Sequence, residues 1–399
     1  MIATTPFHER LDQLNTTRLW GHWSGYLSAV RYYSSAKHEY FAVRNSAGFF
    51  DTSPLYKYRI VGHDAERLLA GVMTRDIRKC RPGKAQYTVW CDDRGFVLED
   101  GVVFRHAEDE FLLTAAEPNL GFFSDLAGRL EVTIADVTDE FGMLAVQGPR
   151  SREILVKVAP GIENLGYFDH TDTKIGTTPV TVSRTGYTGD LGFEIRVARD
   201  DALPVLDAVI EAGEGHGLRP FGEQALLMAR IEAGLALINV EFSSSRFAYT
   251  DHGRVTPKEL GFGWMLRGID DEGRPFVGRD AIRRELAEKT SRWATVGLLL
   301  DWADYDRVYD EAGLIPPKDE TPIEDEYMLY DDHGERIGYS TSQMYSPVLQ
   351  RHIAIARLRP DLAARGTLVN YELTINHEYQ TVAAEVTRLP FFNPARKTA

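Results

Sequence analysis

Cysteine is scarce in this chain of 399 residues, which contains only Cys80 and Cys91. Two thiols cannot build the disulfide framework of a small secreted domain, and neither lies in a CxxC motif or at a Cys/His spacing typical of zinc ligands. The 11 histidines are scattered as well, without an HxxxH pair. We therefore expect two unpaired thiols in a reducing compartment and no metal site.

Long apolar runs are also missing from the sequence. Nowhere do about 18 apolar residues follow one another, as a membrane-spanning helix requires. The first residues, MIATTPFHERLDQLN, carry charges in place of the apolar stretch of a signal peptide. Lysine and arginine number 45 against 59 aspartates and glutamates, which gives a net charge of −14 that repels phosphate backbones. We expect a cytoplasmic protein that binds neither membranes nor nucleic acid.

The composition is otherwise that of a globular protein, with 43% hydrophobic and 26% charged residues. The length predicts two or three domains. Residues 58–72 (YRIVGHDAERLLAGV) and 143–158 (MLAVQGPRSREILVKV) each read as a strand, a glycine turn and a helix. This echo predicts two related α+β subdomains within residues 1–285, although strand–glycine–helix units are common enough to coincide by chance. Residues 290–399 read as strands with Gly and Pro turns, which predicts a small β-barrel or sandwich.

The segment RTGYTGDLGFEI, residues 184–195, contains three glycines. It also contains Tyr187, whose ring offers a flat amphipathic face, and Glu194 on a strand. Because Glu194 follows Phe193, their side chains face opposite ways, so a buried Phe193 directs Glu194 to the other side of the sheet. A carboxylate there could accept two parallel hydrogen bonds from an amino-pyrimidine edge. A surface strand with a solvated Glu194 fits the residues equally well. No GxGxxG loop or Walker lysine accompanies the segment.

The segment LEDGVV places Glu99 and Asp100 side by side between apolar strand residues. One of two adjacent strand carboxylates must point inward, and an inward carboxylate is costly unless it is hydrogen-bonded or functional. The residues also allow a turn in which both carboxylates are solvated. No GxSxG nucleophile motif is present.

These segments belong to a series of motifs that resembles the aminomethyltransferase (T protein) of the glycine cleavage system and its superfamily, which includes tetrahydrofolate-dependent demethylases. The resemblance covers nearly the whole chain and keeps the motifs in order. The motifs are HEYFAVRNSAGFFDTS (38–53), VGHDAERLL (61–69), GKAQYT (83–88), LEDGVV (98–103), AVQGPRS (145–151), RTGYTGDLGFEI (184–195), ARIEAG (229–234), TPKELGFGW (256–264), FVGRDAI (276–282) and GYSTSQMYSPVLQRHIAIA (338–356).

The resemblance implies an α+β fold of three domains arranged as a cloverleaf, with a C-terminal β-barrel-like domain and a central channel for tetrahydrofolate. Residues 1–285 would form the folate-binding region. By motif, Asp100 matches the active-site aspartate near the reacting pterin nitrogen. Glu194 matches the carboxylate that holds the pterin edge. Tyr187, Arg230 and Thr114 match further residues of the folate site, although Thr114 replaces a family asparagine.

The sequence departs from the family pattern in two regions that flank the substrate end of the channel. The family's FxGWxMPxxY stretch is replaced by LWGHWSGYLSAVRYY (19–33), and its short YGxEL connector by the longer LINVEFSSSRFAYTDHGR (237–254). Aromatic side chains there suit a methylated cation or an aryl ether, and a histidine or tyrosine could donate a proton; an aromatic core cluster is the other interpretation. The candidate substrate-binding residues are Trp20, His22, Trp23, Tyr26, Tyr249 and His252.

The motifs at the folate end of the channel are kept, whereas those at the substrate end are changed. This combination favours a one-carbon donor different from that of the T protein. The resulting hypothesis is a demethylase that moves a methyl group from a small N-, S- or O-methylated substrate to tetrahydrofolate, giving 5-methyltetrahydrofolate. The alternative is the aminomethyltransferase reaction, which takes its carbon from a lipoyl carrier protein and releases ammonia. A third hypothesis is a folate-binding protein without catalysis, although its typical cysteine motif is missing.

Overall fold

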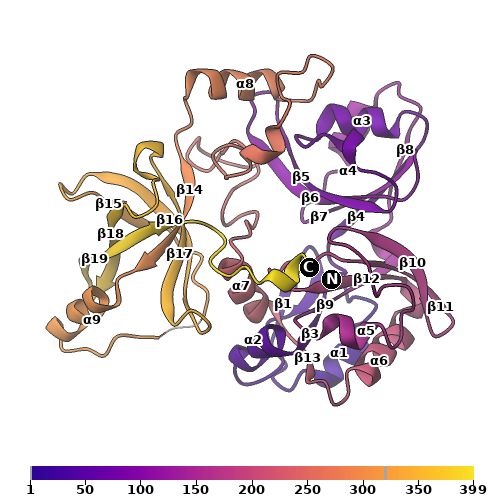
Figure 1. Ribbon diagram of the computed structural model, residues 1–399, viewed down its shortest axis with the longest axis horizontal. Coiled ribbons are helices and arrows are strands. Elements are labelled where there is room, and N and C mark those ends of the chain that lie inside the picture. The colour runs from indigo at the N-terminus through magenta and orange to yellow at the C-terminus, as the bar shows by residue number, and fades with distance from the viewer. Residues whose placement is uncertain (1, 319–320) are drawn as a thin grey trace.

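The computed structural model describes residues 2–318 and 321–399. Two helix-flanked sheets and a closed barrel form three lobes, and the barrel lies apart from the two sheets (Figure 1). The predicted α+β cloverleaf with a C-terminal β-barrel is therefore confirmed. Within the described residues no helix is long and apolar enough to cross a membrane.

The first lobe is built on a six-stranded sheet with the order β10-β11-β12-β9-β3-β13, in which only β13 runs parallel to its neighbour. An N-terminal hairpin, β1–β2, and five helices flank it. The strands are β1 (Trp20–Trp23), β2 (Tyr26–Ala29), β3 (Ala47–Asp51), β9 (Phe141–Gln147), β10 (His170–Ile175), β11 (Thr178–Ser183), β12 (Gly192–Ala198) and β13 (Leu218–Pro220). The helices are α1 (His8–Leu14), α2 (Ala36–Asn45), α5 (Ser151–Leu155), α6 (Ala202–Ala212) and α7 (Glu223–Glu232).

The second lobe is an antiparallel five-stranded sheet with the order β5-β6-β7-β4-β8. Helices α3 and α4 pack on one face, and α8 packs at the β5–β6 turn. The strands are β4 (Tyr56–Val61), β5 (Lys84–Cys91), β6 (Val97–Arg105), β7 (Glu110–Ala115) and β8 (Thr133–Asp136). The helices are α3 (Ala65–Val72), α4 (Leu120–Ala127) and α8 (Arg279–Glu288).

The two predicted strand–glycine–helix units are present as β4–α3 and β9–α5. Gly62 and Gly148 make the turns with φ values of 142° and 126°, which side chains rarely adopt. A Cβ at Gly62 would lie 2.3 Å from the carbonyl oxygen of Glu131, and one at Gly148 would lie 2.6 Å from that of Val43. Each unit thus needs glycine for both backbone angle and space.

The C-terminal lobe is a closed barrel, so the barrel alternative is correct and the sandwich is not. Its strands are β14 (Ala294–Leu300), β15 (Tyr327–Tyr330), β16 (Arg336–Ser346), β17 (Arg351–Leu358), β18 (Leu368–Ile375) and β19 (Glu378–Thr387), with α9 (Trp302–Glu311) against it. Short 3₁₀ turns span Ile77–Lys79, Thr138–Glu140, Arg199–Asp201, Gly263–Leu266, Pro360–Leu362 and Ala395–Lys397. After β19 the chain returns to the first lobe, where the Phe392 N–H donates to the Glu232 carbonyl oxygen at 2.8 Å.

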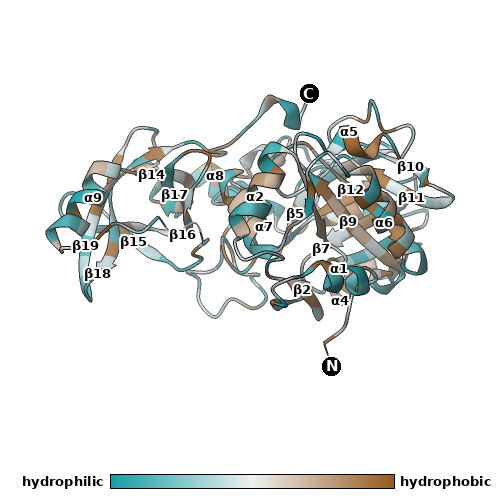
Figure 2. Cartoon of the chain, turned by 90° about the horizontal axis from the view of Figure 1, so that it is seen from below, coloured by the Kyte–Doolittle hydropathy of each residue, from teal (hydrophilic) through white to brown (hydrophobic). Residues whose placement is uncertain are grey.

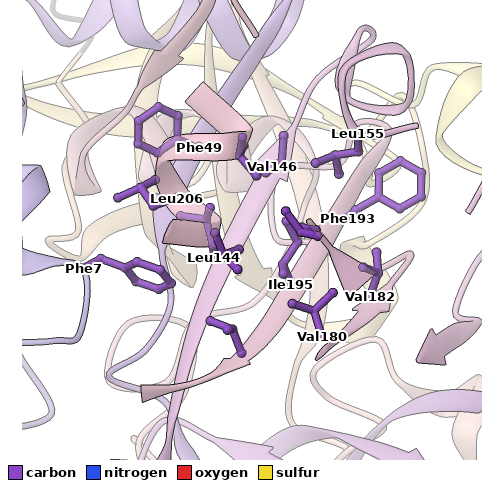
Figure 3. Close-up of a cluster of buried hydrophobic side chains, with 14 of the residues drawn as sticks. Phe7, Phe49, Leu144, Val146, Leu155, Val180, Val182, Phe193, Ile195 and Leu206 are labelled. Atoms are coloured by element: carbon purple, nitrogen blue, oxygen red, sulfur yellow. The ribbon is translucent and has the colours of Figure 1, made fainter. Parts of the chain in front are cut away.

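Alternation along the strands decides what each sheet face presents. Phe193 and Ile195 point into an apolar core shared with β9, α5 and α6 (Figure 3), and the same lobe carries the brown stretches around β9 and β12 in Figure 2. The other face carries Glu194 and Phe141. Phe141 packs against Phe104 on the uncovered face of the second sheet. The two sheets therefore face one another through the surfaces that bear Glu194 and, on β6, Asp100.

Candidate functional site

Asp100 lies on β6 and accepts a hydrogen bond from the Tyr87 hydroxyl on β5, with 2.8 Å between the Tyr87 oxygen and Oδ2. Burial raises the pKa of Asp100, and the hydrogen bond from Tyr87 opposes that rise because it favours the charged form. No cation forms an ion pair with Asp100 in the described ranges. The carboxylate is therefore held without a cation, by the Tyr87 hydroxyl and by a backbone N–H that also favours its charged form, and its Oδ1 accepts from no other side chain of the described residues.

Glu99 points to the opposite, helix-covered face of the same strand, where it is 1% exposed. Its Oε2 has no hydrogen-bond partner among residues 2–318 and 321–399. Burial, and next the charge of Asp100, raise the pKa of Glu99, so the neutral form is favoured. The predicted division of the two carboxylates between the sheet faces is thus present.

Glu194 lies on β12 opposite Ser183 and Ala145, on the face that looks toward the second sheet. Its Oε2 accepts a hydrogen bond from the Thr185 hydroxyl. Burial raises the pKa of Glu194, with Thr185 acting in the other direction. Like Asp100, Glu194 has no cation partner among the residues that the structure describes, so its second oxygen can accept from a ligand.

Two tyrosines lie close to Asp100. Tyr187 lies in the loop between β11 and β12 and donates its hydroxyl to the Ala236 carbonyl oxygen. Burial raises its pKa, and the charges of Arg230 and Asp100 both act on the phenol, which places it near each of them. Tyr87 was not among the residues predicted for the site. It lies within the GKAQYT motif (83–88), and strand alternation together with the motif was the signal that could have found it.

Thr114 belongs to the same surface. On β7 it pairs with Val102, which in turn pairs with Tyr87, so the three residues form the row next to Asp100. The Thr114 hydroxyl donates to the Val102 carbonyl oxygen at 3.4 Å. This contact leaves the hydroxyl oxygen as an acceptor at the edge of the site.

Arg230, on α7, is fully buried; its two terminal nitrogens are hydrogen-bonded within this chain, whereas its Nε has no partner among the described residues. Its Nη1 donates to both Glu241 carboxylate oxygens at 2.8 Å. Its Nη2 donates to Glu324 Oε1 and to Ser342 Oγ, each at 2.9 Å. Arg230 therefore links α7 to the barrel, and a folate could reach its Nη2 only if Glu324, which is one-third exposed, moved.

The predicted aromatic residues of the β1–β2 hairpin do not gather in one place. Trp20 packs against His8 in a tilted arrangement with ring centroids 4.6 Å apart. His22 is exposed and accepts from the Gly25 N–H of its own turn. Trp23 is the member nearest the site, because its ring lies 6.1 Å from Phe50, which shares a sheet face with Glu194.

The hairpin tip approaches the strand end beside Asp100. Tyr26 donates its hydroxyl to Asp139. Ser24, at the turn, donates to the Ala116 carbonyl oxygen at 2.9 Å, just beyond Ala115, which pairs with Gly101. The hairpin thus borders the site through its tip.

The other two candidate substrate residues lie in the loop after α7. Tyr249 is fully exposed, and its side chain packs on nothing. His252 packs against Tyr339 of the barrel with ring centroids 4.5 Å apart, and its Nε2 lies 3.4 Å from Glu326 Oε2. The structure therefore does not bring these two side chains together with the hairpin aromatics, and their substrate roles stay predictions.

The histidines and cysteines of the described residues are dispersed or buried. Across residues 2–318 and 321–399, no group of three or more His, Cys, Asp or Glu side chains could hold a metal ion. Cys80 and Cys91 are free and buried, and burial raises the pKa of both thiols. Neither thiol is therefore activated as a nucleophile.

Comparisons with known proteins agree with this architecture. The family model described as the GCVT N-terminal domain matches residues 7–267, and the one described as the glycine cleavage T-protein C-terminal barrel domain matches residues 312–393. The crystal structure of glycine cleavage system aminomethyltransferase T from Bartonella henselae has a TM-score of 0.82 and 24% identity, covering 98% of this chain and 99% of that one.

Curated proteins with three different names are similar in sequence to this chain. A trimethylamine-oxide aldolase of Ruegeria pomeroyi is 34% identical over 98% of this chain, which spans 47% of that longer protein. A heme-dependent oxidative N-demethylase gamma subunit of Ectopseudomonas mendocina is 31% identical over 94% of this chain and 92% of its own length. An aminomethyltransferase of Geobacillus kaustophilus is 30% identical over 91% of this chain and 92% of its own. The chain therefore belongs to the glycine cleavage T-protein family of transferase enzymes.

Proposed function

We propose that this protein is a tetrahydrofolate-dependent demethylase, which moves a methyl group from a small methylated substrate to tetrahydrofolate and gives 5-methyltetrahydrofolate. The observation that carries the proposal is the pair of half-buried carboxylates, Asp100 and Glu194, on facing sheet surfaces. Neither has a cation partner in the described chain. Such carboxylates are expensive to bury unless a ligand supplies hydrogen-bond donors, as the amino-pyrimidine edge of a pterin does.

Each residue has a distinct task in this reaction. When bound, tetrahydrofolate supplies the nucleophilic ring nitrogen that accepts the methyl group. Glu194 holds the pterin edge, with one oxygen fixed by Thr185. Asp100, fixed by Tyr87, keeps its second oxygen for the proton that leaves the nitrogen as the new bond forms. Holding donor and acceptor in line supplies much of the rate enhancement.

The charges around the site favour a cationic methyl donor. Besides burial, which raises the pKa of the Tyr187 phenol, the charge of Arg230 lowers it and those of Glu241, Asp100 and Glu324 raise it. The excess of carboxylates attracts positive charge. Two relatives are named for N-methylated compounds, a trimethylamine-oxide aldolase and an N-demethylase. Among N-, S- and O-methylated substrates we therefore place N-methylated ammonium compounds and amine oxides first.

The aminomethyltransferase reaction is the second candidate, because a relative of that name matches 91% of this chain at 30% identity. That activity needs a lipoyl carrier protein and yields 5,10-methylenetetrahydrofolate and ammonia. The departures at residues 19–33 and 237–254 argue against it, since they replace two family motifs at the substrate end. Folate binding without turnover is the third candidate.

The deciding experiment incubates the purified protein with tetrahydrofolate and a panel of donors: trimethylamine N-oxide, glycine betaine, sarcosine, a sulfonium compound and a methoxyarene. The folate products are then separated, and the amounts of 5-methyl- and 5,10-methylenetetrahydrofolate are measured. We expect the 5-methyl product with an N-methylated donor. The methylene product, formed only with a lipoyl carrier, would assign the aminomethyltransferase reaction instead, and binding without any product would leave a folate-binding protein.

The role of Asp100 has its own test. Asp100→Asn keeps the shape but removes the proton acceptor, so we expect turnover to fall by about 100-fold or more while the Kd for tetrahydrofolate stays within about threefold. Asp93→Asn, in the exposed β5–β6 turn, is the matched control and should behave as the unmodified protein. Near-normal turnover of Asp100→Asn would remove Asp100 from the chemistry.

A further inference from the structure

The chain end packs against the loop that carries Tyr187. Residues 184–191 join β11 to β12 without regular structure, and Glu194 follows two residues into β12. Arg396, far along the chain, reaches the last part of this loop. Its Nε and Nη2 donate to the two carboxylate oxygens of Asp190 at 2.7 and 2.8 Å, a bidentate ion pair on a buried carboxylate.

The same segment contacts the start of the loop through its backbone. Arg184 Nη2 donates to the carbonyl oxygens of Arg396 at 3.3 Å and Lys397 at 3.2 Å. The C-terminal segment (392–397), called the tail below, therefore donates to the loop through Arg396. The loop donates to the tail through Arg184. The tail bridges residues 184 and 190 and so spans the stretch that holds Tyr187.

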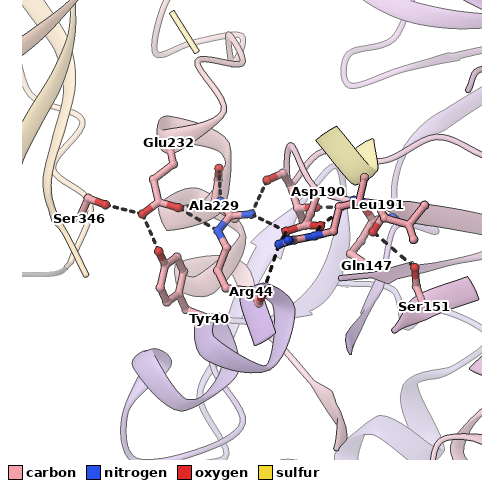
Figure 4. A network of polar contacts seen from close by, with 11 residues as sticks. Tyr40, Arg44, Gln147, Ser151, Asp190, Leu191, Ala229, Glu232 and Ser346 are labelled. Atoms are coloured by element: carbon pink, nitrogen blue, oxygen red, sulfur yellow. Dashed lines mark hydrogen bonds and ion pairs between the residues drawn. The ribbon is translucent and has the colours of Figure 1, made fainter. Parts of the chain in front are cut away.

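The tail is itself anchored on the first lobe. The Phe392 ring lies 4.4 Å from the guanidinium carbon of Arg44, and the Phe392 N–H bonds to Glu232. Arg44 in turn donates to the Thr188 carbonyl oxygen at 2.8 Å and to Glu232 at 2.9 Å, in the network drawn in Figure 4. The middle of the loop is thus held from α2 and its start from the tail, while Asp190 at its end is held from both, since Arg44 Nη1 also lies 3.7 Å from Asp190 Oδ2.

We propose that residues 392–397 form a clasp that positions loop 184–191, and with it Tyr187 and Glu194, for tetrahydrofolate binding. The inference rests on the proposed function and adds Arg396 to it as a positioning residue. A loop that is ordered before the ligand arrives binds it more tightly. The reason is that the apparent affinity decreases when fewer molecules are in the binding-competent conformation. The effect should therefore appear in the binding of the folate, with little effect on the methyl donor.

The test compares Arg396→Ala, Arg396→Lys and the control Arg388→Ala, an exposed arginine between β19 and the tail. Tetrahydrofolate affinity, donor KM at saturating folate, thermal stability and hydrogen exchange of residues 184–191 are measured for each. We expect Arg396→Ala to raise the Kd for tetrahydrofolate about fivefold, equivalent to about 1 kcal/mol, with faster exchange in the loop. Arg396→Lys should recover part of the loss, because it keeps the charge but not the bidentate contact. Arg388→Ala should match the unmodified protein.

Two results would overturn the clasp. One is wild-type exchange and affinity in Arg396→Ala. The other is a general rise of exchange with a lower Tm, which would make Arg396 a stabilising residue without a special effect on the loop. If the unmodified protein binds no tetrahydrofolate, the proposed function fails, whereas exchange in the free protein still decides whether the tail orders the loop.

Discussion

Replacing Tyr87 by phenylalanine would remove one hydroxyl and little else. The ring lies edge-on to Phe262 with centroids 5.7 Å apart, and phenylalanine preserves that contact. The lost group is the donor to Asp100 Oδ2 at 2.8 Å. Because this hydrogen bond favours the charged carboxylate, its removal adds to the effect of burial and raises the pKa of Asp100 further.

The size of the shift follows from the strength of the bond. A hydrogen bond to a charged group contributes about 1.5–3 kcal/mol, and one pKa unit corresponds to about 1.4 kcal/mol, which gives a shift of about one to two units. Asp100 must be deprotonated to accept the proton, so the rate rises as pH increases through its pKa. In Tyr87→Phe that rise should move to higher pH by about one unit, because Asp100 is partly open to solvent.

The assay is the pH dependence of kcat/KM for 5-methyltetrahydrofolate formation between about pH 5 and 9, the range in which an acid with a raised pKa controls the rate. The variant should approach the wild-type rate at the alkaline end, since the charged form is then restored. Tyr56→Phe, on strand β4 of the same sheet and stacked on Tyr58, is the control and should leave the profile unchanged. An acidic limb that stays in place, or moves to lower pH, would refute the role given to the Tyr87–Asp100 pair.

Two further variants separate binding from stability. Glu194→Gln should weaken tetrahydrofolate binding by about tenfold, as expected for one lost charge-assisted hydrogen bond, and leave the Tm unchanged; unaltered affinity in a binding titration would take Glu194 out of the pterin site. Arg44→Met should lower the free energy of unfolding by about 3–5 kcal/mol, because it leaves the buried Glu232 carboxylate without its 2.7 Å ion-pair partner; a urea transition at the wild-type midpoint would contradict this.

Local pattern was enough to predict the parts of the fold that depend on neighbouring residues. The two glycine turns, at Gly62 and Gly148, were visible because strand and helix patterns meet there. Alternation along β12 correctly placed Phe193 and Glu194 on opposite faces of the sheet, and the structure buries Phe193. Both inferences need only the chemistry of adjacent residues.

Contacts between residues that lie far apart in the sequence could not be predicted from it. Arg230 was expected near the folate, yet its two terminal nitrogens are engaged by Glu241 and by Glu324, which lies 94 residues away on the barrel side. The bond between Arg396 and Asp190 joins residues 206 positions apart. Tyr87 was within a recognised motif, but its partner is fixed by the register of β5 on β6, which no single-residue property indicates.

Helix α7 limits where this chain can be cut or recombined. Arg230 and Glu232 lie on it two residues apart, and each contacts the barrel, through Ser342 and Ser346 respectively. The strand pattern suggests a domain border near residue 290. A cut there would remove the barrel serines that hydrogen-bond to the buried Arg230 and Glu232 of the N-terminal piece. Chimeras that exchange barrels between relatives should therefore carry both serines with the barrel, and fragments split at this border are expected to need each other in order to fold.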